Sequence, residues 1–226
     1  MKHYILCLIF IALFMQACSD NPADFDPSSD VEVYLVTVDD EYQKVEESDI
    51  LYIQSHDQNR RFALYGDIGN WTVAAREENQ ITDIFPRDGY NDGLFFVYLT
   101  QNEGESGRES SVSVINSHGL ERFTIHFYQF GSLPEIFVVP QAEIDASGGP
   151  MTIRVYTNTD WTVDDSSLPS WISQSVKVQD AYQFAVGTND TGSDRSTVLT
   201  FICTSDPTIY SETIIKQYIV KKLKTV

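Results

Sequence analysis

Short runs in which apolar and polar residues alternate make up most of the chain beyond residue 30. Alternation of period two indicates β-strands with one buried face, and no segment shows the longer period of an amphipathic helix. In the second half the predicted strands, separated by Gly, Asn, Asp and Pro, are 136–139, 151–156, 161–163, 171–178, 182–186, 197–204 and 212–220. About seven short strands in roughly a hundred residues predict an all-β, immunoglobulin-like antiparallel sandwich.

The sequence also repeats itself. Asn-Trp-Thr-Val at residues 70–73 matches Asp-Trp-Thr-Val at residues 160–163. Residues 102–110 match residues 189–197, and both segments contain an asparagine and an arginine six positions apart. Landmarks that recur in the same order at a nearly constant offset indicate two copies of one structural unit.

The boundary between the copies is predicted near residue 131. The last apolar strand of each copy ends near Gln129 or Gln217, and Gly-Ser-Leu-Pro at residues 131–134 leaves only a short turn between the copies. We therefore predict two tandem sandwich domains, residues 30–130 and 131–226, that are closely joined rather than free to swing.

The N-terminus has the layout of a secretory signal. Lys2 precedes an apolar run that is too short to span a bilayer, and Met-Gln-Ala-Cys follows at residues 15–18. The small residue before Cys18 resembles the lipobox of bacterial lipoproteins, which predicts a signal peptide at residues 1–17 and a lipid on Cys18. The alternative is an ordinary signal peptide cleaved nearby.

Residues 18–29 are acidic, polar and proline-bearing, which predicts a flexible tether. This stretch resembles the one that directs many Bacteroidota lipoproteins to the outer face of the outer membrane, although periplasmic retention stays open. Attachment to the membrane would then be through the lipid alone. With Cys7 in the signal and Cys18 lipidated, Cys203 has no partner for an intramolecular disulfide.

Four segments of the second copy form a recognisable set: Ile-Asp-Ala-Ser-Gly-Gly at 144–149, the Trp161 segment at 157–163, Trp171 with Ile172, and residues 188–196. Together they resemble the BACON family (Bacteroidetes-associated carbohydrate-binding, often N-terminal). The first copy is degenerate, with Asp-Gln-Asn at 57–59 in place of Ser-Gly-Gly and Ile81 aligned with Trp171. The resemblance implies a small β-sandwich found in surface lipoproteins and beside glycoside hydrolases and proteases. Carbohydrate or mucin binding is proposed for the family, a spacer role is equally arguable, and no catalytic residue is implied.

The repeat also identifies candidate ligand-binding residues. Aligning residues 95–99 with residues 182–186 places one set of apolar side chains inward in both copies and leaves Phe96 and Tyr98 on the opposite face. An outward aromatic pair predicts either a ligand surface or burial against the second domain, and both readings stay open. Tyr65 and Tyr156 end equivalent strands and are further candidates, although cross-strand pairing explains them as well.

Other conspicuous residues are predicted to be structural. Trp71 and Trp161 share a strand face with valine, which favours a place in the core, and Cys203 is predicted to be a buried thiol. Acidic residues between Asn189 and Arg195 are spaced loosely like a calcium loop, but a hairpin turn built from Asn and Gly explains them better. We therefore predict no metal and no cofactor.

Charge and motifs limit the function. Lys and Arg number 15 against 33 Asp and Glu, and the net charge of -18 argues against nucleic acid and anionic lipid as partners. Signatures of zinc peptidases, serine hydrolases and P-loop proteins are missing, which favours a non-catalytic protein. We expect binding of a polysaccharide or host glycan; the alternatives are a spacer or adhesin-like module with protein partners, or an accessory subunit of an outer-membrane nutrient importer.

Overall fold

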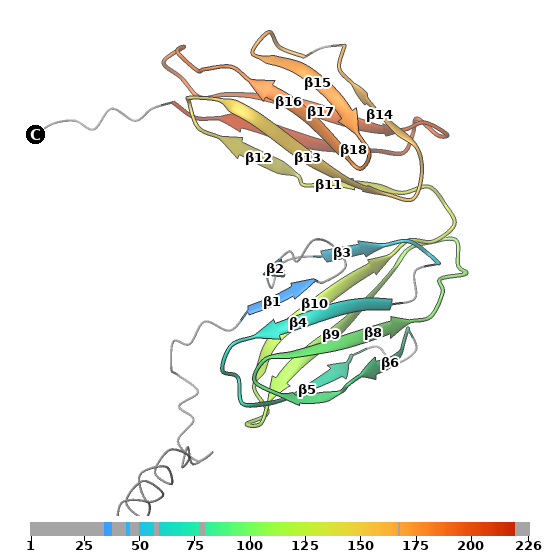
Figure 1. Ribbon diagram of the computed structural model, residues 1–226. Coiled ribbons are helices and arrows are strands. Elements are labelled where there is room, and N and C mark those ends of the chain that lie inside the picture. Colours follow the sequence, from blue (N-terminus) through green and yellow to red (C-terminus); the bar gives the residue numbers. More distant parts are fainter. Residues whose placement is uncertain are drawn as a thin grey trace, which may run out of the picture.

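The computed structural model describes residues 34–37, 44–45, 50–56, 59–76, 80–166 and 168–219. These residues form β-strands joined by turns and bends, and none of them is helical (Figure 1). Within these ranges there is accordingly no apolar helix of membrane-spanning length. The predicted signal peptide, the lipidation of Cys18 and the acidic tether lie outside the described residues.

The described strands form two sets that meet between Gln129 and Ile136 (Figure 1). The first set is β1 (Tyr34–Thr37), β2 (Lys44–Val45), β3 (Ile50–Ile53), β4 (Asn59–Tyr65), β5 (Asn70–Ala75), β6 (Ile81–Phe85), β7 (Asp88–Tyr90), β8 (Gly93–Leu99), β9 (Arg108–Asn116) and β10 (Glu121–Gln129). The second is β11 (Ile136–Val138), β12 (Gln141–Ile144), β13 (Gly149–Thr157), β14 (Trp161–Asp164), β15 (Ile172–Val178), β16 (Ala181–Val186), β17 (Arg195–Cys203) and β18 (Tyr210–Gln217).

Each set folds into two sheets that pack face to face. The first domain has the strand orders β2-β1-β4-β8-β6 and β3-β10-β9-β5-β7, and the second has β11-β13-β16-β15 and β12-β18-β17-β14. When β2 and β7 are left out, the two domains have the same strand order. The predicted all-β fold of two tandem immunoglobulin-like sandwiches is therefore confirmed.

The first strand of each domain is divided between the two sheets, which the sequence pattern did not reveal. In the second domain β11 pairs antiparallel with β13, and β12 then pairs parallel with β18. The equivalent strands β1 and β3 pair with β4 and β10 in the same way. Pro140 lies between β11 and β12, and because proline cannot donate to a ladder, the chain leaves one sheet there and joins the other.

Both predicted core tryptophans are buried. Trp71 exposes 2% of its surface and Trp161 exposes 4%. Cys203 is fully buried and lies opposite Trp161 across the β14–β17 pair, as Asn116 lies opposite Trp71. The alignment of Ile81 with Trp171 is wrong by one residue, because Ile81 pairs with Leu99 while Ile172 pairs with the equivalent Val186.

Three buried or partly buried side chains form a polar lock at one end of the second domain. Arg195 donates from Nε to Gln217 Oε1 at 2.7 Å and from Nη2 to the Gly187 carbonyl at 2.7 Å. Gln217 Nε2 donates to the carbonyls of Gly187 and Ala146 at 2.9 and 3.2 Å. Asn189 Nδ2 donates to the Gln217 carbonyl at 3.4 Å. We call these three side chains the Asn-Arg-Gln lock.

The first domain contains the same lock. Arg108 Nε donates to Gln129 Oε1 at 3.1 Å, and Gln129 Nε2 donates to the Ser55 carbonyl at 3.0 Å. Asn102 Nδ2 donates to the carbonyls of Gln129 and Phe130 at 3.2 and 3.0 Å. The asparagine and arginine of the sequence repeat, and the glutamine that ends each copy, therefore recur because they satisfy the same buried carbonyls.

The lock also accounts for the acidic loop that loosely resembles a calcium site. Asn189 Oδ1 accepts a hydrogen bond of 2.7 Å from the Thr191 hydroxyl and one of 3.3 Å from the Thr191 amide, which is the geometry of an Asx turn. In the described parts of the chain, no group of three or more His, Cys, Asp or Glu side chains is placed to hold a metal ion. The loop is not the predicted hairpin, however: it joins β16 to β17, which lie in different sheets, and Asn189 holds this crossing.

Replacing Gln217 by leucine should destabilise the second domain by about 1–3 kcal/mol, because Arg195 Nε loses its acceptor and three backbone carbonyls lose the Nε2 donor that they share. Urea unfolding followed by circular dichroism measures this loss. The control is Gln183→Leu, which makes the same change at an exposed position of β16. Equal stability of the two variants would contradict the structural role of the lock.

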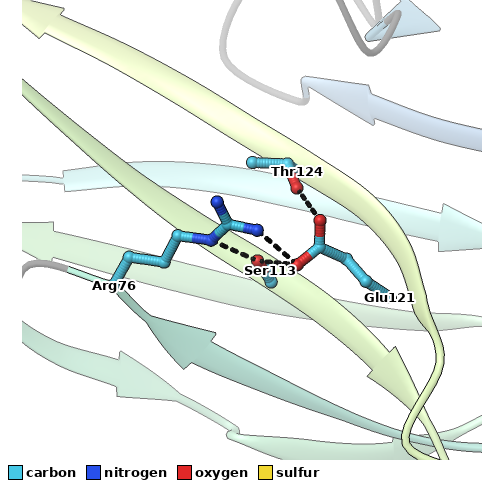
Figure 2. A network of polar contacts seen from close by, with 4 residues as sticks. All are labelled: Arg76, Ser113, Glu121 and Thr124. Carbon is cyan, nitrogen blue, oxygen red and sulfur yellow. Dashed lines mark hydrogen bonds and ion pairs between the residues drawn. The ribbon is translucent and has the colours of Figure 1, made fainter.

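A second polar network lies on the outer face of the sheet β3-β10-β9-β5-β7 (Figure 2). Glu121 Oε2 accepts from Arg76 Nη2 at 2.6 Å and from Ser113 Oγ at 2.7 Å, and Glu121 Oε1 accepts from the Thr124 hydroxyl. The hydrogen bonds from Thr124, Ser113 and Arg76, in that order, lower the pKa of Glu121 to about 2. The network ties β5 to the β9–β10 hairpin.

Because the pKa of Glu121 in the folded protein is about 2, below its ordinary value of 4.5, the charged network stabilises the folded state above about pH 4.5. That stabilisation should be lost as the pH falls toward 2. In Glu121→Gln, the free energy of unfolding should therefore fall less steeply than in the wild type between pH 5 and 2, as measured by denaturant titrations. Glu103→Gln, which removes an exposed carboxylate elsewhere, is the control for the loss of one charge; parallel curves for Glu121→Gln and the wild type would refute the idea.

Candidate functional site

Three of the four predicted ligand-binding residues lie on one face of the first domain. Tyr65 on β4 and both Phe96 and Tyr98 on β8 point outward from the sheet β2-β1-β4-β8-β6, and all three are partly buried. Tyr156 lies elsewhere, at the end of β13 in the second domain, where its ring stacks on that of Tyr52. The four candidates are therefore not one site.

The alternation of β8 explains the outward position of the pair. Phe95 and Val97 are fully buried and Leu99 nearly so, because every second side chain of the strand enters the core. The residues between them, Phe96 and Tyr98, must then point away from the core. The rings of Phe96 and Tyr98 are stacked, with centroids 6.3 Å apart and an angle of 25° between their planes.

The structure adds two residues that the sequence pattern did not identify. Phe85 on the edge strand β6 pairs directly with Phe96 and exposes 65% of its surface. Leu94, two positions before Phe96 on β8, exposes 52%. We call Phe85, Leu94, Phe96 and Tyr98 together the aromatic face.

Polar and charged groups border the aromatic face. Across the β4–β8 pair, Arg61 lies opposite Phe96 and Asn59 lies opposite Tyr98. On the other side Asp83 pairs with Tyr98, and its carboxylate is 3.9 Å from a guanidinium nitrogen of Arg87. Apolar rings at the centre with hydrogen-bonding groups around them are the usual composition of a small-molecule or carbohydrate contact surface.

The ring contacts between the domains bear on the alternative that Phe96 and Tyr98 are buried against the second domain. The rings of Tyr52, Tyr128 and Phe130 meet the second domain, where all three contact Phe137. Tyr52 and Tyr128 lie on β3 and β10, in the other sheet of the first domain. Phe96 and Tyr98 therefore occupy a different face from the one that meets the second domain.

Trp171 and Cys203 have local structural partners. Trp171 is partly buried beneath Arg195 of the lock, whose guanidinium carbon is 4.6 Å from the ring centroid. Burial alone would raise the pKa of the Cys203 thiol, but hydrogen bonds with Ser205, the Asp206 backbone and Thr159 more than offset this and lower the pKa. With its surface fully covered, this thiol is placed for packing against Trp161.

No protein-family model matches the chain, and no curated protein matches it. Among solved structures, the chain is similar to a Bacteroides ovatus GH5 xyloglucanase in complex with a heptasaccharide, at 16% identity and a TM-score of 0.34, over 48% of this chain and 20% of that one. It is similar to domains 4–9 of the surface layer protein SbsC at 10% identity and a TM-score of 0.33, over 83% of this chain and 31% of that one. It is also similar to a three-immunoglobulin-domain structure of titin at 6% identity and a TM-score of 0.29, over 83% and 66%. Similarities with TM-scores this low carry no argument about function. The chain also spans only a minor part of the first two proteins. The resemblance to the BACON family stays a prediction.

Proposed function

We propose that this protein is a non-catalytic surface lipoprotein that binds glycan chains on the aromatic face of its first domain. The supporting observation is the exposure of large apolar side chains, with Phe85 at 65% and Leu94 at 52%, beside the stacked pair of Phe96 and Tyr98. Burying such side chains stabilises a fold, so a cluster of them on the surface indicates contact with something else.

The chemistry of this face suits a sugar. A pyranose ring presents C–H groups on its flat side, which pack on an aromatic ring, and hydroxyl groups at its edge. Asn59, Arg61 and Asp83 lie beside the rings and supply donors and acceptors for those hydroxyls. The net charge of -18 disfavours nucleic acid and anionic lipid on the same surface.

A binding role fits this face better than hydrolysis. A glycosidase needs two carboxyl groups at a fixed separation on either side of the scissile bond. Of the four residues that pair across the strands with Phe96 and Tyr98, only Asp83 carries a carboxylate, and that carboxylate is close to Arg87. Phe85 and Leu94 are largely exposed, so a partner bound here would also be in contact with water, which weakens electrostatic catalysis.

The predicted export signals complete the proposal. A lipid on Cys18 and the acidic tether at residues 18–29 would attach the chain to the outer membrane and let the aromatic face meet glycans outside the cell. Outer-membrane protein partners, such as a nutrient importer, would then take up what the first domain captures.

A structural spacer with protein partners is the second candidate, and a separate observation favours it. Tyr52, Tyr128 and Phe130 of the first domain form one aromatic cluster with Phe137 and Tyr156 of the second. A ring cluster of this size resists rotation between domains, which is the mechanical property that a spacer needs.

Glycan binding is tested with the chain from residue 19, applied to glycan arrays and to native gels that contain soluble polysaccharides. The wild type should be retained by at least one uncharged polysaccharide. Phe85→Ala/Phe96→Ala should weaken retention about tenfold or more, because aromatic contacts of about 0.5–1.5 kcal/mol each are lost at two positions.

The matched control is Tyr210→Ala, which removes an aromatic ring of 57% exposure from the second domain. This variant should be retained like the wild type. If folded wild-type protein binds no glycan of host or plant origin, the glycan proposal fails and the spacer becomes the better reading. If Tyr210→Ala loses binding and Phe85→Ala/Phe96→Ala does not, the site has been placed in the wrong domain.

A further inference from the structure

Strand β3 lies at the edge of its sheet, on the side of the first domain that faces the second (Figure 1). Among the strands that the structure describes, it pairs only with β10, in parallel, over the residues Ile50–Ile53. Leu51 and Ile53 point into the first core, so Tyr52 points outward. A short edge strand held by one parallel neighbour is the kind of element that detaches readily from a sheet.

The outward side of β3 is covered by the second domain. The ring of Tyr52 stacks on that of Tyr156, with centroids 4.4 Å apart and 22° between the planes, and on that of Phe137 at 5.2 Å and 30°. Gln54, just after β3, donates from Nε2 to the Thr157 carbonyl at 2.9 Å. Residues of the second domain therefore contact β3 through both rings and a hydrogen bond.

The connection between the domains is held by polar contacts as well. Asn158 Nδ2 donates to the carbonyls of Gly131 and Leu133 at 3.0 and 2.8 Å, and Asn158 Oδ1 accepts from the Glu135 amide at 2.8 Å. Glu135 in turn accepts a hydrogen bond of 2.6 Å from the Tyr128 hydroxyl. The turn at residues 131–135 thus has side-chain partners from both domains, which limits the angles it can adopt.

We infer that the second domain clamps β3 onto the first domain, so that the two domains form one rigid body and part of the first fold depends on its neighbour. The clamp consists of Phe137, Tyr156 and the Thr157 carbonyl on one side and of Tyr52 and Gln54 on the other. This inference is independent of the proposed glycan site, which lies on the other sheet.

Hydrogen exchange followed by mass spectrometry on the chain from residue 19 tests the clamp. In Tyr156→Ala, the amides of β3 should exchange about tenfold faster than in the wild type, because the strand loses its main ring contact. The amides of β4 and β8 in the first domain and of β17 in the second should keep their protection. Thr152→Ala, an exposed position on the same outward side of β13, is the matched control and should leave β3 unchanged.

Unchanged exchange in β3 of Tyr156→Ala overturns the inference, whatever happens in the second domain. If β3 and β17 both lose protection, Tyr156→Ala has unfolded the second domain. The variant Gln54→Ala then tests the clamp instead. That variant removes the hydrogen bond from the side of the first domain. Faster exchange of β3 with a protected β17 then supports the clamp, and unchanged exchange of β3 overturns it.

Discussion

The structure depends on hydrogen bonds to the backbone carbonyls at the points where the chain of each sandwich passes from one sheet to the other. The described part of the chain contains no disulfide, since Cys203 is a free thiol, so side chains must hold these crossings. The Asn-Arg-Gln lock does this by binding carbonyls from separate segments at one buried point. In the first domain the lock reaches Ser55, just after β3, and the Phe130 carbonyl, so it also fixes the residues that meet the second domain. The same side chains therefore bind the backbone carbonyls of the first domain and help to fix its position relative to the second.

Much of the fold could be predicted because the physical signals were local. Alternation of apolar and polar residues located the strands, and the recurrence of asparagine, arginine and glutamine indicated two domains. The sequence alone did not show that these three residues bind one another and the backbone carbonyls. Phe85 was missed because a register irregularity lies between Ile81 and Asp83. Strict alternation from the buried Ile81 would place Phe85 inside, whereas the irregularity shifts the inward position to Ile84. Tyr156 could not be assigned from its own strand, because its ring partner, Tyr52, comes from another domain.

Two edge strands, β15 and β6, have features that disfavour pairing with a further strand, and these features bear on how the exposed Phe85 is interpreted. On the edge strand β15, the register shifts between Ser173 and Val176, and Lys177 points inward, 4.2 Å from the centroid of the Trp161 ring. A register irregularity and an inward lysine both discourage pairing with another strand. On the edge strand β6, the irregularity and the following Pro86 have the same effect. Phe85 lies on this edge strand, so the proposed glycan contact would use the face of the sheet and not the addition of a strand.

The two proposals about this protein concern different sets of aromatic residues, and that division is itself informative. Tyr52, Phe137 and Tyr156 are stacked across the joint, so their rings are already used to hold the domains together. Phe85 and Leu94 face outward on the opposite sheet, where the fold gains little from them. If the protein acted only as a spacer, the contacts between the domains would be enough for that role. Polar residues in place of Phe85 and Leu94 would then make the protein more soluble. Large apolar side chains at these two positions are therefore better explained by the proposed ligand, which two domains joined in this way would hold away from the membrane.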